Sequence, residues 1–234
     1  MMESTATQIP LKLNSQERYQ FDNFYFIDQE LKLAISDFCE SSTMGFMFLW
    51  GAKATGKTHL SLAVVDYLQK TKRAVYLPLA ELVNTGSPAV LESVENLDLL
   101  CIDDLDAIAG KQQWEEALFH CFNRLQNTGC KLLVASHTNP AMTAITLADL
   151  RSRLATGLVY KLEPLDDEAK HRMLMLQAQS SGLKLPEEVA HYLLRHYSRD
   201  VTELMILLKK LDSASMVEKR RLTIPFVRQI LANG

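Results

Sequence analysis

Short apolar runs alternate along the first two thirds of the chain with stretches in which apolar residues recur every three or four positions. The short runs are typical of buried strands, and the longer stretches are typical of amphipathic helices. Strands are predicted at residues 46–50, 74–77, 97–104, 131–137 and 158–162. Strands that alternate with helices favour a parallel sheet covered on both faces. We therefore predict an α/β domain built on a five-stranded parallel sheet.

The strand pattern stops after Pro164, and the rest of the chain shows only helical spacing. Helices are expected at residues 166–181, 186–196, 201–215 and 224–231. These helices predict a small all-helical domain. The expected organisation is a tail at 1–16, an α/β domain at 17–163 and the helical domain at 164–234.

The composition indicates the broad class of protein to which the chain belongs. The chain has 234 residues, of which 47% are hydrophobic and 23% are charged, as in soluble globular proteins. The net charge of −3 offers no broad electrostatic attraction to nucleic acid. No secretory signal is visible, no apolar run is long enough to cross a bilayer, and the four cysteines form no C-x-x-C pair. We expect a cytoplasmic protein with reduced thiols.

The most informative motif joins the first predicted strand to the helix that follows. Residues 51–58 read Gly-Ala-Lys-Ala-Thr-Gly-Lys-Thr, which fits the pattern of a phosphate-binding loop. Its glycines let backbone N–H groups turn toward a phosphate, and the helix start adds further N–H groups. Lys57 is expected to contact the β- and γ-phosphates, and the Thr58 hydroxyl to bind Mg²⁺. The predicted nucleotide-binding residues of this segment are Gly51, Ala52, Lys53, Ala54, Thr55, Gly56, Lys57, Thr58 and His59.

Two aspartates end the third predicted strand. At the carboxyl end of a strand, Asp103 can face the phosphate loop and hold Mg²⁺ through water. Asp104 can polarise an attacking water. The alternative is a solvated turn, but the position after a phosphate loop and an apolar strand favours the catalytic interpretation. The six histidines are scattered, so no histidine-based metal site is predicted.

The tail contains one apolar stretch, residues 8–13, which read Gln-Ile-Pro-Leu-Lys-Leu. Pro10 disfavours both helix and central strand, so Ile9, Leu11 and Leu13 are exposed unless something covers them. The residues alone leave two interpretations: a tail packed on its own domain, or a short peptide that docks in the groove of another protein.

Taken in order, these features resemble an AAA+ ATPase. Residues 17–234 are similar to the AAA+ part of the bacterial replication initiator DnaA, and more closely to the Hda family of shorter homologues, the regulatory inactivators of DnaA. Three features favour the Hda family. The chain stops after the helical lid, without a helix-turn-helix DNA-binding domain; residues 114–117 read Trp-Glu-Glu-Ala; and residues 222–227 read Leu-Thr-Ile-Pro-Phe-Val.

The resemblance implies two partner-binding elements. Arg153 matches the family's arginine finger, which stabilises charge on ATP held by a neighbouring subunit. A structural ion pair is the alternative role, and Arg151 suits it. The tail stretch is similar to the family's peptide for the DNA polymerase III sliding clamp (the β subunit), with its binding residues at Gln8, Ile9, Leu11 and Leu13.

Two positions depart from the initiator's pattern. His137 stands where the initiator has an aspartate, so the sensor role falls to Ser136 or His137. Thr202 occupies the position of the lid's sensor arginine, and Arg199 lies one helical turn away as a substitute. The resemblance therefore implies bound ADP or ATP with Mg²⁺, and weak hydrolysis by the chain itself.

The implied function is negative regulation of chromosomal DNA replication initiation. Tethered to the DNA-loaded clamp, the chain would present Arg153 to ATP bound by DnaA and convert the initiator to its ADP form. A homodimer is expected, with DNA reached through the clamp and DnaA, and no membrane partner. The alternatives are an autonomous AAA+ ATPase of helicase-loader type and a non-catalytic, nucleotide-sensing adaptor between clamp and initiator.

Overall fold

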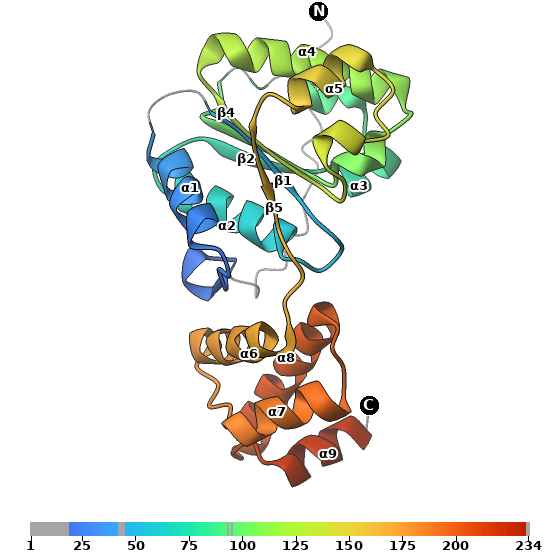
Figure 1. Cartoon of the computed structure of the whole chain (residues 1–234). Coiled ribbons are helices and arrows are strands. Elements are labelled where there is room, and N and C mark those ends of the chain that lie inside the picture. Colours follow the sequence, from blue (N-terminus) through green and yellow to red (C-terminus); the bar gives the residue numbers. More distant parts are fainter. Residues whose placement is uncertain (1–18, 42–44, 93, 95, 233–234) are drawn as a thin grey trace, which may run out of the picture.

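A computed structural model of the chain describes residues 19–41, 45–92, 94 and 96–232. It contains a sheet domain and a smaller helical lid below it (Figure 1). The predicted clamp peptide, with Gln8, Ile9, Leu11 and Leu13, lies outside the described residues and stays a prediction.

Five parallel strands form one sheet in the order β2-β3-β4-β1-β5, which confirms the predicted α/β fold. The third strand, at Leu99–Asp103, is shorter than the predicted 97–104, and the side chain of Asp98, just before it, accepts from the N–H of Arg73. The strands are β1 (Phe46–Trp50), β2 (Ala74–Pro78), β3 (Leu99–Asp103), β4 (Lys131–Ser136) and β5 (Leu158–Lys161).

Helices cover both faces of the sheet (Figure 1). Side chains along β1 alternate between the two faces: Met47 and Leu49 pack with α1 (Gln29–Glu40) and α2 (Lys57–Gln69), whereas Phe48 packs with α4 (Gln112–Thr128). The helices of this domain are α1 (Gln29–Glu40), α2 (Lys57–Gln69), α3 (Leu79–Thr85), α4 (Gln112–Thr128) and α5 (Ala148–Leu154). The described residues also include short 3₁₀ helices: η1 (Phe21–Asn23), η2 (Pro88–Leu91), η3 (Leu105–Ile108) and η4 (Pro140–Met142).

The lid is all-helical, as predicted. It consists of α6 (Asp167–Ser181), α7 (Glu187–His196), α8 (Val201–Glu218) and α9 (Ile224–Ala232). Leu174, Leu193, Leu204 and Phe226 are buried in its core. Helix α8 extends beyond the predicted end at residue 215. Among the described residues, no helix is both long and apolar enough to span a membrane.

The direction of the strands determines where functional segments lie. All five strands are parallel, and β5 leads into the lid, so the carboxyl ends of the strands point toward the lid (Figure 1). The loop after β1 and the acidic end of β3 therefore share the edge of the sheet that faces the lid. Helix α5 ends just before β5 begins, so its last turn lies at the opposite edge.

Candidate functional site

The predicted phosphate loop joins β1 to the first residue of α2, at the edge of the sheet that faces the lid (Figure 1). A Cβ atom at Gly51 would lie 2.4 Å from the carbonyl oxygen of Leu162, so only glycine fits there. Gly56 has a φ of +92° and precedes α2, and its Cβ would lie 3.0 Å from the ring of Phe24. Both motif glycines are thus required by the local geometry.

Lys57 is buried inside this loop. Its Nζ donates hydrogen bonds to the carbonyls of Gly51 and Ala52, both at 2.8 Å. Burial lowers the pKa of Lys57, and the nearby charges of Asp103, Asp104 and Asp106 oppose that shift. The buried ammonium of Lys57 therefore lies among the negative charges of these three aspartates.

The remaining loop residues complete the cradle. The Thr55 hydroxyl donates to the Ala52 carbonyl at 3.0 Å, which closes the loop on itself. Ala54 adopts a positive φ of +63°, and Lys53 is exposed. Thr58 is exposed in the first turn of α2, where its hydroxyl is accessible to a cation.

Asp103, at the end of β3, is buried and held at both carboxylate oxygens. The Tyr76 hydroxyl donates to Oδ2 at 2.8 Å, and the N–H of Asp104 donates to Oδ1 at 2.9 Å. Burial raises the pKa of Tyr76, and the charge of Asp103 raises it further, so the phenol stays a donor. Asp104 has a left-handed backbone (φ +54°), and burial together with the charge of Asp103 raises its pKa.

A third aspartate, which the sequence interpretation did not include, organises the end of β4. The carboxylate of Asp106 accepts from the Ser136 hydroxyl (3.0 Å), the His137 N–H (2.6 Å) and the Thr138 hydroxyl (2.9 Å). Burial alone would raise the pKa of Asp106, but these hydrogen bonds hold it below its usual value. Ser136 and His137, the two predicted sensor candidates, are thus both bound to Asp106.

An aromatic cluster lies beside the phosphate loop. The His59 ring packs edge-on against Tyr19 and Phe24, with ring centroids 5.2 and 5.3 Å apart. Nε2 of His59 hydrogen-bonds to Oδ1 of Asn23 at 2.9 Å. The segment that precedes α1 is therefore held against the first turn of α2.

These residues fit a nucleotide with Mg²⁺. The loop and the start of α2 supply N–H groups, Lys57 a buried ammonium, Thr58 an exposed hydroxyl and Asp103 a fixed carboxylate, which are the donor types that such a ligand requires. Within the described part of the chain, no cluster of three histidine, cysteine or acidic residues suits another metal.

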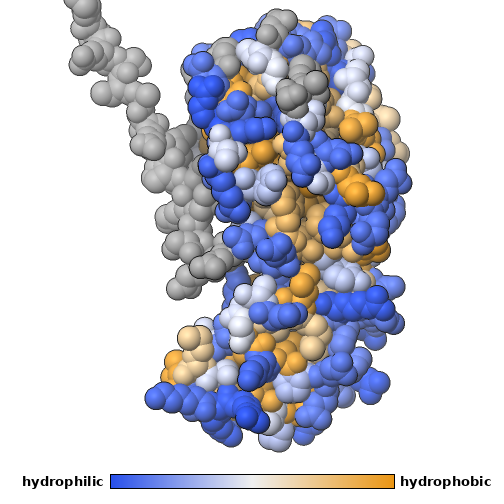
Figure 2. All heavy atoms as spheres, turned by 90° about the vertical axis from the view of Figure 1, so that its left-hand side faces the viewer, coloured by the Kyte–Doolittle hydropathy of each residue, from blue (hydrophilic) through white to orange (hydrophobic). Residues whose placement is uncertain are grey.

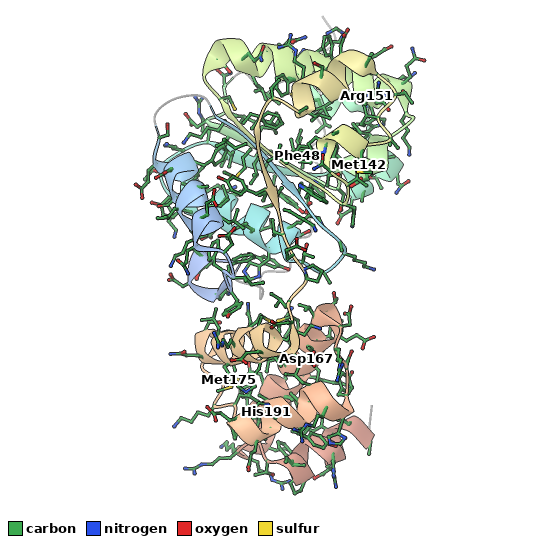
Figure 3. All side chains as sticks on the ribbon, viewed as in Figure 1. Phe48, Met142, Arg151, Asp167, Met175 and His191 are labelled. Atoms are coloured by element: carbon green, nitrogen blue, oxygen red, sulfur yellow. The ribbon has the colours of Figure 1, made fainter. Side chains whose placement is uncertain are left out.

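The structure does not bring Arg153 to this site. Arg153 lies in the last turn of α5, at the edge of the sheet opposite the phosphate loop (Figure 1). Its Nη1 donates to Oε1 of Gln126 at 2.7 Å, and its guanidinium lies 5.9 Å from the Phe122 ring centroid. Arg151, labelled on the same helix in Figure 3, donates to the Ile145 carbonyl at 3.1 Å.

Arg199 lies in the lid, just before α8. It is exposed, and its Nη2 lies 3.6 Å from a carboxylate oxygen of Asp167, the first residue of α6. Figure 3 labels Asp167 on the side of the lid that faces the sheet domain. Through this ion pair, Arg199 is placed at the side of the lid that faces the sheet domain.

A separate pocket of about 230 Å³ lies on the α1 side of the sheet domain, the face turned toward the viewer in Figure 2. It contains no residue of the phosphate loop, so it is not the nucleotide site. Its lining residues are Phe21, Phe26, Lys32, Ile35, Ser36, Cys39, Glu40 and Tyr67.

Family comparisons agree with this geometry. Residues 15–161 match the family model described as the bacterial DnaA ATPase domain. The chain belongs to the DnaA ATPase-domain family. Residues 167–231 match the Hda lid domain, so this family member is an Hda-like, DnaA-related protein, which confirms the predicted resemblance. An uncharacterized protein of Haemophilus influenzae is 39% identical over 228 residues, covering 96% of this chain and 98% of that protein.

Solved structures confirm the AAA+ fold of this DnaA-family chain. Domain III of the Thermotoga maritima replication initiation protein DnaA has a TM-score of 0.75 at 23% identity, over 92% of this chain and 96% of that one. AMPPCP-bound DnaA of Aquifex aeolicus has a TM-score of 0.67 at 24% identity, over 83% and 65% of the two chains.

Proposed function

We propose that this chain binds ADP or ATP with Mg²⁺ at residues 51–58 and stimulates hydrolysis of ATP bound to DnaA. Lys57 and the loop N–H groups hold the phosphates, while Thr58 and Asp103 hold the metal, directly or through water. Mg²⁺ neutralises charge on the phosphate oxygens when it is bound. Arg153 is then the arginine finger, supplied in trans to the nucleotide of the partner.

One observation carries this proposal. Arg153 and the chain's own phosphate loop lie at opposite edges of the same sheet. A guanidinium at that edge has no access to the nucleotide of its own chain, but it is available to a second subunit docked beside α5. Because the finger supplies charge stabilisation to a transition state, its natural target is ATP held by a related AAA+ protein. The Hda-type lid supports DnaA as that protein.

The proposed role in replication involves the tail peptide and two faces of the chain, the α5 face and the nucleotide face. The tail peptide at 8–13 would dock on the sliding clamp, which brings the chain to replicating DNA. Hydrolysis of DnaA-bound ATP would then act as negative regulation of initiation. Without DnaA, a homodimer would cover the α5 face or the nucleotide face of each copy.

The test follows radiolabelled ATP pre-bound to DnaA, with clamp-loaded DNA present. Wild type should convert it to ADP, and Arg153→Ala should slow the reaction by about 10³- to 10⁵-fold, as for other arginine fingers. Lys57→Ala should abolish ADP binding to the chain itself. A tail variant, Gln8→Ala/Leu11→Ala/Leu13→Ala, should also abolish the conversion, because the chain can no longer dock on the clamp.

Other results would favour the alternatives. Steady-state hydrolysis by the isolated chain that Lys57→Ala and Asp104→Ala both remove would indicate an autonomous ATPase. Full conversion of DnaA-bound ATP by Arg153→Ala would indicate an adaptor without a finger.

A further inference from the structure

Outside the nucleotide site, the described residues include a buried carboxylate with several hydrogen-bond donors, that of Glu115 in the first turn of α4. Its side chain is 1% exposed and accepts hydrogen bonds from two separate loops. The N–H of Gly110 donates to Oε1 at 2.7 Å. On the other side, the Thr146 hydroxyl (2.7 Å), the Thr146 N–H (3.0 Å) and the Leu147 N–H (2.8 Å) donate to Oε2.

These donors belong to two different segments of the chain, one that follows β3 and one that precedes α5. Gly110 ends the stretch that begins at Asp103 and Asp104 and continues through η3. Leu147 is the residue that precedes α5, and its carbonyl accepts the N–H of Arg151 at 3.1 Å. Glu115 therefore connects the acidic segment of the chain's own nucleotide site to the start of the helix that carries Arg153.

Helix α4 holds α5 at both ends. Glu115 binds the start of α5, and Gln126, further along α4, binds Arg153 near its end. Leu150, between these two contacts, and Leu154, directly after Arg153, are fully buried. A short helix that is fixed at its start and packed through two buried leucines keeps its backbone in one place relative to the sheet, which is what a finger that must reach into another subunit requires.

We propose that Glu115 is the positioning residue for Arg153: its carboxylate fixes α5 against the segment 103–110, so that Arg153 meets the nucleotide of the partner in a productive geometry. This role rests on the proposed function. Burial opposes the ionised form of Glu115, but its hydrogen-bond donors hold its pKa below the usual value, so the carboxylate accepts from all of them at neutral pH.

The test compares Glu115→Gln with Glu116→Gln. Glu116 is the neighbouring residue on α4; it is exposed and accepts from Gln112 at 2.8 Å. Glutamine at 115 keeps the size of the side chain but replaces one acceptor oxygen with a donor. In the isolated chain, Glu115→Gln should lose hydrogen-exchange protection at the amides of Gly110, Thr146 and Leu147 while binding ADP as wild type does.

In the assay of DnaA-bound ATP, Glu115→Gln should lower the maximal rate by about 10- to 100-fold, the size expected when a reacting group is displaced by about 1 Å. The half-saturating concentration should stay unchanged. Glu116→Gln should behave as wild type in both measurements. If Glu115→Gln fails to fold, Thr146→Val, which removes one donor, should lower the rate while Thr146→Ser, which keeps the hydroxyl, restores it.

The outcomes separate the two proposals. If wild type leaves the DnaA-bound ATP intact, the proposed function fails, and the positioning role fails with it. If wild type is active and Arg153→Ala is not, but Glu115→Gln or Thr146→Val retains the full rate, only the positioning role is overturned. Retained protection at all three amides in Glu115→Gln would also overturn it.

Discussion

At the scale of single residues, His59 shows how burial determines charge beside the phosphate loop. Its ring is packed against Tyr19 and Phe24 and bonds to Asn23. This burial lowers the pKa of His59 to about 4. The ring is therefore neutral at neutral pH, and Nε2 serves as the donor to Asn23, whose Oδ1 is an acceptor.

A pH dependence of stability follows from His59. In the unfolded chain this histidine takes up a proton near pH 6.5, about the ordinary value. Between that pH and about 4, the unfolded state binds more protons than the folded state. The contribution of His59 to the free energy of unfolding is thus complete above about pH 6.5 and is lost as the pH falls toward 4. Its full size is about 3 kcal/mol.

Urea unfolding at pH 7 and pH 5 measures this contribution. His59→Gln should remove part of the difference between the two pH values, whereas replacement of the exposed histidine in His120→Gln should leave the difference unchanged. An equal pH dependence in wild type and His59→Gln would contradict the prediction.

At the scale of elements, a buried lysine joins the sheet to a helix. Lys131 begins β4, and its Nζ donates to the backbone carbonyls of Phe38 and Cys39, in the last turn of α1. Carbonyls in the last turn of a helix have no partner within the helix. Lys131 therefore caps α1 and fixes its end against the sheet, with a positive charge at the negative end of the helix dipole.

Loss of this cap should destabilise the protein. Lys131→Met keeps the apolar stem but leaves buried carbonyls without their donor, so we expect the free energy of unfolding to fall by about 1–3 kcal/mol. Chemical denaturation with an unchanged m-value measures the loss. Lys70→Met, at an exposed lysine after α2, is the matched control, and an equal effect of the two substitutions would refute the capping role.

At the scale of the whole molecule, the segment before α1 bridges the two domains. The side chain of Asn23 bonds to His59 on α2, while its carbonyl accepts from Nε2 of Gln177 on α6 at 2.6 Å. Tyr25, two residues further on, packs against the core of the lid. The segment that packs against the phosphate-loop helix α2 therefore also contacts the lid, and it helps to fix the position of the lid relative to the sheet domain.

Removal of this bridge should loosen the lid. Gln177→Ala breaks one inter-domain hydrogen bond, worth about 0.5–1.5 kcal/mol, which shifts an equilibrium between lid positions by about two- to tenfold. Fluorescence energy transfer between labels on α4 and α8 should show a broader distance distribution than in wild type. Gln179→Ala, at an exposed glutamine on the same helix, should match wild type; a broadening of equal size in both variants would count against the bridge.

The sequence by itself determined the strands, the lid helices and the phosphate loop. The strands and lid helices follow from local apolar spacing, and the loop at 51–58 follows from its pattern of two glycines, a lysine and a threonine between a strand and a helix. Such signals are local, because each depends on neighbouring residues in the chain. The AAA+ resemblance rested on the same signals.

Only the tertiary structure decided which distant groups meet. Asp106 and His137 are 31 residues apart, as are Glu115 and Thr146, and they meet because β4 lies next to β3 and α5 lies next to α4. The same packing puts Arg153 and the phosphate loop at opposite edges of one sheet. No local pattern encodes these relations, since strand order and helix packing are properties of the assembled chain.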